Sequence, residues 1–169
     1  MDTARDEVTI PDTVDRVRRE WTQAYPHFDT SPIEVLGRVQ RIASVCNHRL
    51  DADLARHDVN RSEFTVLSAL ARAERPLRAS EVVSTTMLSG ASITKIAESL
   101  VGRGLVVRHR SERDGRVVLL ELTDAGRGVV EDEMPRRLAD DEQLIAGLTA
   151  TERETLAALL RKVCAALGE

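Results

Sequence analysis

Basic and small hydroxyl side chains gather in one stretch of this 169-residue chain, residues 78–116. Seven Lys and Arg (78, 95, 103, 108, 110, 113, 116) stand there against four acids (81, 98, 112, 114), a local charge of +3, whereas the whole chain carries −4. Guanidinium, ammonium and hydroxyl groups bind phosphate oxygens and base edges. A basic face on an acidic protein directs a polyanion to one surface. These residues favour nucleic-acid binding.

The elements that must position these residues follow the order helix, helix, helix, hairpin. Asn60 and Glu63 predict a capping box at the start of the first helix. A short second helix is expected over about 79–86, and Ser89 is expected to cap a third, with Ile93, Ile96, Ala97, Leu100 and Val101 as its apolar face. Residues 105–110 and 116–122 are predicted strands, joined by a turn with a strong Asp-Gly hairpin signal. This pattern predicts a mainly α winged helix-turn-helix core with a two-stranded wing, a DNA-binding fold.

The side chains expected to contact DNA lie on the outer face of the third helix, at helix N-termini and on the wing. Lys95 can reach a guanine edge or a phosphate, and an Arg of the wing can enter the minor groove. Asp114 is expected to orient a neighbouring Arg rather than to touch phosphate. The set is Arg78, Ser89, Ala91, Ser92, Thr94, Lys95, Ser99, Arg113, Asp114 and Arg116.

Helical segments flank this core on both sides. A short helix is expected from about residue 13 to 25, a second of about 26 residues opens with a Ser31–Glu34 capping box, and Thr149 with Glu152 predicts a cap for the last helix. We therefore expect N-terminal helices over residues 1–57, the winged-helix core over 58–122 and C-terminal helices over 123–169. Their spare apolar faces predict a dimerisation layer, although they could instead complete one monomeric core.

The rest of the composition narrows the class of protein. Cys46 and Cys164 fit no disulfide or metal framework, and His27, His48, His57 and His109 show no metal-ligand spacing, so no metal or cofactor is expected. A nucleophile elbow, phosphate loop or paired-carboxylate motif is absent, so the chain is not expected to be an enzyme. We expect no leader and no membrane span, and a reducing cytoplasm as the setting.

Several short motifs together resemble one family. Glu63–Leu67, Ser92–Lys95 followed by Leu100, Gly104–Val106, Arg113–Arg116 and Leu122–Gly126 have the order and spacing of the MarR-family transcriptional regulators. The resemblance implies an obligate dimer that binds a pseudo-palindromic operator in double-stranded DNA and usually represses a nearby gene. It also implies release by a small acidic or phenolic ligand, or by an oxidant.

The N-terminal helix resembles the urate-responsive branch of that family. Trp21 and Arg108 match that branch, whereas Thr65 and Ile96 replace its expected Asp and Arg. The resemblance thus implies the architecture, with a pocket for a small acidic or aromatic effector, whereas only half of the residues that bind urate in that branch are present. The residues expected to line it are Trp21, Arg38, His48, Thr65 and Arg108, where Arg38 and Arg108 could pair with a carboxylate. Equally, Trp21 could be a core aromatic, and the arginines could bridge helices to acidic residues.

Two other classes of protein remain open. A thiol switch at Cys46 would make the chain a redox-sensing regulator, although a buried structural cysteine is the commoner fate of this residue. A winged helix can also serve as a protein-interaction adaptor, which the basic wing disfavours. A steep fall of DNA affinity with salt would separate a DNA-binding protein from an adaptor.

Overall fold

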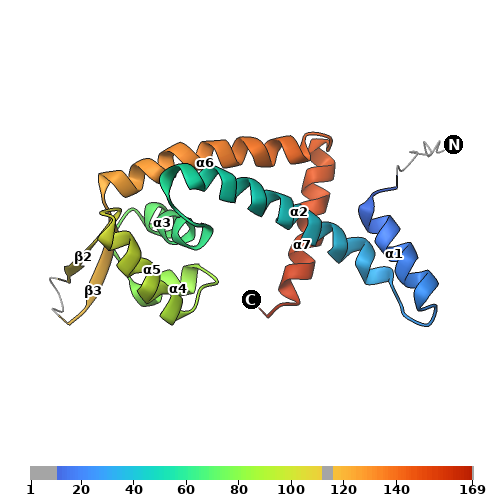
Figure 1. The fold of residues 1–169 in the computed structure, drawn as a ribbon, viewed down its shortest axis with the longest axis horizontal. Helices are drawn as coiled ribbons and strands as arrows, with labels where there is room; N and C mark the ends of the chain where they lie inside the picture. The colour runs from blue at the N-terminus through green and yellow to red at the C-terminus, as the bar shows by residue number, and fades with distance from the viewer. Residues whose placement is uncertain (1–10, 112–115, 169) are drawn as a thin grey trace. The chain divides into compact units, whose positions relative to one another are not determined.

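The computed structural model describes residues 11–111 and 116–168 (Figure 1). The chain forms two compact units, residues 1–49 and residues 50–169. The predicted Arg113, Asp114 and the Asp-Gly turn lie outside the described residues. In the described part of the chain, no helix combines the length and the apolar character that a membrane span requires.

The first unit contains helix α1 (Thr13–Ala24) and most of helix α2 (Ser31–Leu54). Asp12 begins α1 with a complete capping box that includes Asp15. The two helices approach closely at Gly37, where an added Cβ would lie 2.8 Å from a methyl group of the buried Val14. A side chain at Gly37 would therefore push α1 away from α2.

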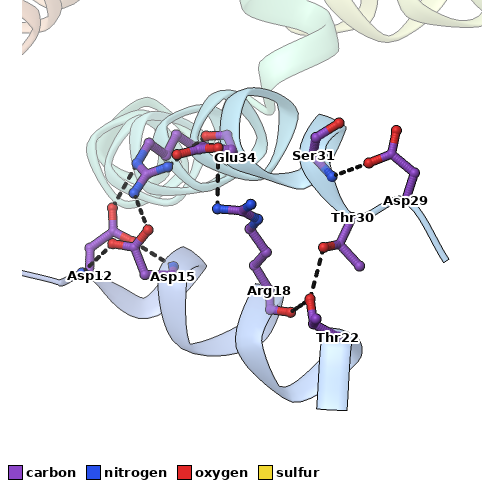
Figure 2. Close-up of polar contacts among 9 residues, drawn as sticks. Asp12, Asp15, Arg18, Thr22, Asp29, Thr30, Ser31 and Glu34 are labelled. Carbon is purple, nitrogen blue, oxygen red and sulfur yellow. Dashed lines mark hydrogen bonds and ion pairs between the residues drawn. The ribbon is translucent and has the colours of Figure 1, made fainter. Parts of the chain in front are cut away.

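Polar contacts complete the pairing of α1 with α2, as Figure 2 shows. Arg38 of α2 donates to Asp12 at 2.9 Å and to Asp15 at 2.8 Å. The hydrogen bond from the Asp12 backbone, and then the bond from Arg38, hold the pKa of Asp15 below its ordinary value. Arg38 thus bridges two helices through acidic residues, one of the two roles considered for it above.

The predicted Ser31 cap of the second helix is wrong by one residue. Helix α2 already includes Ser31, so Pro32 follows the first helical position. The Ser31 backbone N–H is satisfied by Asp29 Oδ1 at 2.9 Å, in the segment before the helix (Figure 2). Asp29 therefore satisfies the Ser31 N–H that the predicted capping box assigned to the Glu34 side chain, because an Asx turn can bind the first N–H of a helix.

The second unit contains the winged-helix core. A 3₁₀ turn, η1 (Ala55–His57), follows α2, and helices α3 (Arg61–Ala73), α4 (Ala79–Thr85) and α5 (Gly90–Gly102) come next. The predicted caps are confirmed, since Asn60 forms a capping box with Glu63, and Ser89 accepts from the Ser92 N–H. In Figure 1, α3 lies beside the first half of α6, and α4 and α5 lie farther from α6 than α3 does.

The sheet has three strands rather than the two expected. Strands β2 (Val106–Arg110) and β3 (Val118–Leu122) form the wing, and β1 (Leu77–Arg78) adds to β3 in the order β1-β3-β2. All pairings are antiparallel, with Leu77 opposite Leu120 and Arg108 also opposite Leu120. The sequence does not predict β1, because two residues are too few to show the alternation of apolar and polar residues that indicates a strand.

The core lies between α3, α5 and the sheet. Its fully buried side chains include Phe64 and Leu67 of α3, and Ile93 and Leu100 of α5. Helix α6 (Asp124–Ile145) begins at the cap Thr123 and continues past Pro135, and α7 (Ala150–Ala165) begins with the predicted Thr149–Glu152 capping box. The long α6 adds Val129 to this core near its own start.

Candidate nucleic-acid interface

Helix α5 has one buried and one exposed face. Ile93, Ala97 and Leu100 are buried against the core, which fixes the rotation of the helix. The opposite face exposes Ala91, Thr94 and Lys95. A helix anchored in this way offers small side chains and one ammonium group to a groove that admits an α-helix.

The predicted DNA-contacting residues that the structure describes all reach the surface. Ser92 is half-buried, and the other seven are exposed: Arg78, Ser89, Ala91, Thr94, Lys95, Ser99 and Arg116. Arg78 and Ser89 are the residues directly before the first turns of α4 and α5. Full or partial exposure is compatible with DNA contact for each of them.

Hydroxyl groups organise the start of α5. The Ser89 hydroxyl accepts from the Ser92 backbone N–H at 3.2 Å and lies 2.9 Å from the Ser92 hydroxyl. Thr94 returns its own hydroxyl to the Gly90 carbonyl at 3.1 Å. These local bonds hold the first turn in one conformation, and they leave further oxygen lone pairs for a ligand.

Ser99 makes a contact that its sequence position does not predict. Its hydroxyl donates to Glu63 Oε1 of α3 at 2.8 Å, and Arg103 Nη2 lies 2.6 Å from the same oxygen. The Glu63 side chain is only 8% exposed, so this is a nearly buried carboxylate with three donors around it, counting the Asn60 backbone N–H. The sequence predicts Glu63 as a cap but not its link to α5, because 36 residues separate Glu63 from Ser99.

The wing presents the remaining basic side chains. Arg108 and Arg110 are exposed on β2, and Arg116 is exposed two residues before β3 begins. His109 of the same strand is partly exposed and lies 3.5 Å from Glu121. In the described part of the wing the guanidinium groups therefore belong to its surface, while Val106, Leu120 and Leu122 anchor its base in the core.

The predicted effector residues fall into both units. In the first unit, Trp21 is 45% exposed, and the centroid of its ring lies 5.5 Å from that of Tyr25. Arg38 donates hydrogen bonds to Asp12 and Asp15. His48 is exposed on α2. In the other unit Thr65 donates its hydroxyl to the Arg61 carbonyl at 2.8 Å, and Arg108 is exposed. Trp21 therefore packs on a half-exposed aromatic neighbour. The five residues remain a predicted set.

Both cysteines carry free thiols. Cys46 is half-buried on α2, and Cys164 is exposed near the end of α7.

Comparison with known proteins agrees with this geometry. The MarR family model matches residues 57–117. The HTH-type transcriptional regulator PecS of Dickeya dadantii is 24% identical over 152 residues, covering 89% of this chain and 92% of PecS. The C80S mutant of E. coli MarR in complex with operator DNA has a TM-score of 0.65 at 26% identity and covers 85% of this chain and 96% of MarR.

A further structural relative has a known effector. Bordetella bronchiseptica BpsR, whose DNA binding is regulated by 6-hydroxynicotinic acid, has a TM-score of 0.66 at 27% identity. The match covers 77% of this chain and 92% of BpsR. The relatives are transcriptional regulators rather than enzymes.

Proposed function

Because this chain belongs to the MarR family of winged-helix transcriptional regulators, we propose that it is a dimeric repressor. In this proposal it binds a pseudo-palindromic operator and leaves it when a small acidic or aromatic ligand binds. The observation that carries the proposal is the outer face of α5, a helix whose other face is locked in the core.

Helix α5 is the proposed reading helix. Ala91, Ser92 and Thr94 are small enough to touch thymine methyl groups or phosphates, and Lys95 reaches a guanine edge or a phosphate. Ser89 and Arg78 lie where helix N-termini favour phosphate oxygens. Arg116, together with Arg113 and Asp114, is proposed to take the wing to the adjacent minor groove, where a narrow groove attracts guanidinium groups.

A second copy of the chain is proposed to cover the terminal helices. Helix α7 buries none of its residues, and Leu156, Leu159 and Val163 remain between 41% and 54% exposed along one helical face. In the other unit Val35, Val39 and Ile42 form a similar exposed stripe on α2. Apolar stripes of this extent are typical of interfaces between protein chains. A twofold dimer would place two α5 helices one DNA turn apart, about 34 Å.

The effector is proposed to be a small aromatic acid. The support is the similarity to BpsR, whose DNA binding is regulated by 6-hydroxynicotinic acid, together with the aromatic Trp21 and the basic Arg38 and His48, which belong to one unit. A ligand carboxylate on Arg38 would have to displace Asp12 or Asp15 from the guanidinium. Effector binding would then loosen the pairing of α1 with α2.

Footprinting on the intergenic DNA upstream of the protein's own gene tests this function. Protection of two half-sites, with centres about 10 base pairs apart, is the expected result for a twofold dimer. Addition of a phenolic or heteroaromatic carboxylic acid should remove the protection. A single unpaired footprint, or no protection at any upstream site, would contradict the proposed dimeric repressor.

A further inference from the structure

Three side chains with metal-binding atoms meet in the second unit, outside the proposed DNA interface. His57, the last residue of η1, places Nε2 2.9 Å from Glu133 Oε1 and 3.2 Å from Asp132 Oδ2. Both carboxylates belong to α6, at positions 75 and 76 residues further along the chain. The three ligand atoms all lie within 4.8 Å of one another. The histidine spacing in the sequence does not predict this cluster, because folding alone brings α6 to η1.

The contacts around Glu133 satisfy only one of its two carboxylate oxygens among the described residues. Its side chain is 1% exposed, and Oε1 holds both His57 and Arg56 Nη2, the latter at 2.6 Å. Its other oxygen, Oε2, is buried and has no hydrogen-bond partner among the described residues. Burial of a carboxylate oxygen without a partner is destabilising. A cation that both oxygens could approach would remove that penalty.

The neighbouring charges leave room for a divalent cation. Arg136 contacts Asp132 through Oδ1 at 3.4 Å, so Oδ2 is the oxygen that faces His57. Arg56 is 44% exposed and also lies 3.5 Å from Asp53 Oδ1. Arg56 can therefore shift toward Asp53 when a cation takes its place beside Glu133. The carboxylates there are those of Asp53, Asp132 and Glu133, and the guanidinium groups are those of Arg56 and Arg136. Three negative groups against two positive ones leave a local excess of negative charge.

We propose that His57, Asp132 and Glu133 form a binding site for a divalent transition-metal ion of the zinc class. One imidazole nitrogen and two carboxylates are common zinc ligands, with bonds of about 2.0–2.2 Å, and water can complete a tetrahedron. Tetrahedral bonds of that length separate ligand atoms by about 3.3 Å. The observed 2.9 and 3.2 Å therefore need to open by only a few tenths of an ångström. His57 would carry its proton on Nδ1 and present Nε2 to the metal.

The site would join two parts of the DNA-reading unit. His57 stands three residues before Asn60, the cap of α3, and its partners lie on α6. A bound ion would replace two hydrogen bonds by coordinate bonds at this junction. Because a metal that binds only the folded state stabilises it by mass action, the midpoint of thermal unfolding should rise by roughly 5–10 °C at about 100-fold excess over Kd.

Titration of the chelator-treated full chain with Zn²⁺, and with Co²⁺ as a spectroscopic probe, tests the proposal. We expect one ion per chain and visible Co²⁺ bands from nitrogen and oxygen ligands. His57→Gln and Asp132→Asn should each weaken Zn²⁺ binding by more than about tenfold, since even residues that only orient a ligand contribute about 10–100-fold. Asp132 is 45% exposed, so Asp132→Asn should fold even where a change at the buried Glu133 does not.

His109→Gln is the matched control, because His109 also faces a carboxylate, but only that of Glu121. It should bind Zn²⁺ as the wild type does, as should the double variant Cys46→Ser, Cys164→Ser. Unchanged Zn²⁺ affinity in Asp132→Asn and His57→Gln would overturn the proposal. Loss of binding in the cysteine variant, or the absence of stoichiometric binding in the wild type, would overturn it equally.

Discussion

The Glu63 carboxylate of α3 accepts a hydrogen bond from the Ser99 hydroxyl of α5 at 2.8 Å. The same carboxylate receives Arg103 and caps the Asn60 backbone N–H. Burial by itself would raise the pKa of Glu63, but these hydrogen bonds outweigh it and hold the pKa below the ordinary 4.5. One side chain thus fixes the first turn of α3 against the last turn of the proposed reading helix.

Glu63→Gln is expected to lower the free energy of unfolding at pH 7 and to flatten its pH dependence in acid. A carboxyl group whose folded pKa is depressed stabilises the protein above its unfolded pKa, and this stabilisation is lost as pH falls through the folded pKa. Wild-type stability should therefore fall from about pH 5 downward more steeply than that of the variant. Urea unfolding at several pH values measures both slopes. Glu98→Gln, at an exposed glutamate of α5, controls for charge, and equal acid slopes for Glu63→Gln and wild type would exclude the role of Glu63.

Gly126→Ala is expected to destabilise the junction between α6 and the wing. A Cβ at this position would overlap the Leu105 backbone oxygen, which also accepts from the Thr123 N–H. Because the obstacle is backbone, the substitution should lower the free energy of unfolding by about 1–3 kcal/mol or more. Gly128→Ala, two residues on, meets nothing within 4 Å and should raise it by about 0.5–1 kcal/mol. The midpoints of thermal unfolding of the two variants and of wild type measure these effects. A midpoint of Gly126→Ala equal to that of wild type would contradict the close approach of Gly126 to the Leu105 backbone oxygen.

Leu159→Glu is expected to convert the proposed dimer into single chains. Leu159 is 54% exposed on α7, in the stripe that a second copy is proposed to cover. A carboxylate buried in that interface would lose its hydration without gaining a partner. Light scattering after size exclusion should give twice the chain mass for wild type and the chain mass for the variant. Identical masses for both proteins would exclude α7 from the interface.

Arg116→Ala is expected to weaken operator binding by about 1–3 kcal/mol, the value typical of one specific guanidinium contact. Arg116 is exposed beside the wing strand β3, which is proposed to enter the minor groove when α5 occupies the major groove. Arg137→Ala, which removes an exposed arginine of α6 paired with Asp141, should leave affinity unchanged. Fluorescence anisotropy measures all three proteins. Equal affinities of Arg116→Ala and wild type would remove the wing from the proposed interface.

Local signals in the sequence predicted most of the fold. Asn60, Ser89 and Thr149 stand where helix caps must accept backbone N–H groups, and the structure confirms all three caps. Strand β1 could not be predicted, since its two residues become a strand only by pairing with β3. At the start of α2, two acidic residues could accept from the Ser31 N–H, and the pattern favoured Glu34 of a capping box where the chain uses Asp29.

The polar clusters depend on long-range contacts, so sequence spacing does not reveal them. Glu63 and Ser99 are 36 residues apart, and His57 and Asp132 are 75 apart. Each residue taken alone is an ordinary cap or surface group. Only the packing of α3 against α5, and of α6 beside η1, makes these groups neighbours.

The salt dependence of binding to the upstream intergenic DNA, measured by anisotropy for wild type and Lys95→Ala, tests the central claim most directly. Lys95 is the ammonium group on the exposed face of α5. We expect tight wild-type binding whose affinity falls steeply with salt, and a weaker affinity for Lys95→Ala. If Lys95 contacts a phosphate, the slope of log affinity against log salt concentration should be smaller by about 1 in the variant. If Lys95 contacts a guanine, the loss of affinity should be confined to sites that contain that guanine. A wild-type affinity that does not change with salt, or an affinity of Lys95→Ala equal to that of wild type, would contradict a DNA-reading role for α5.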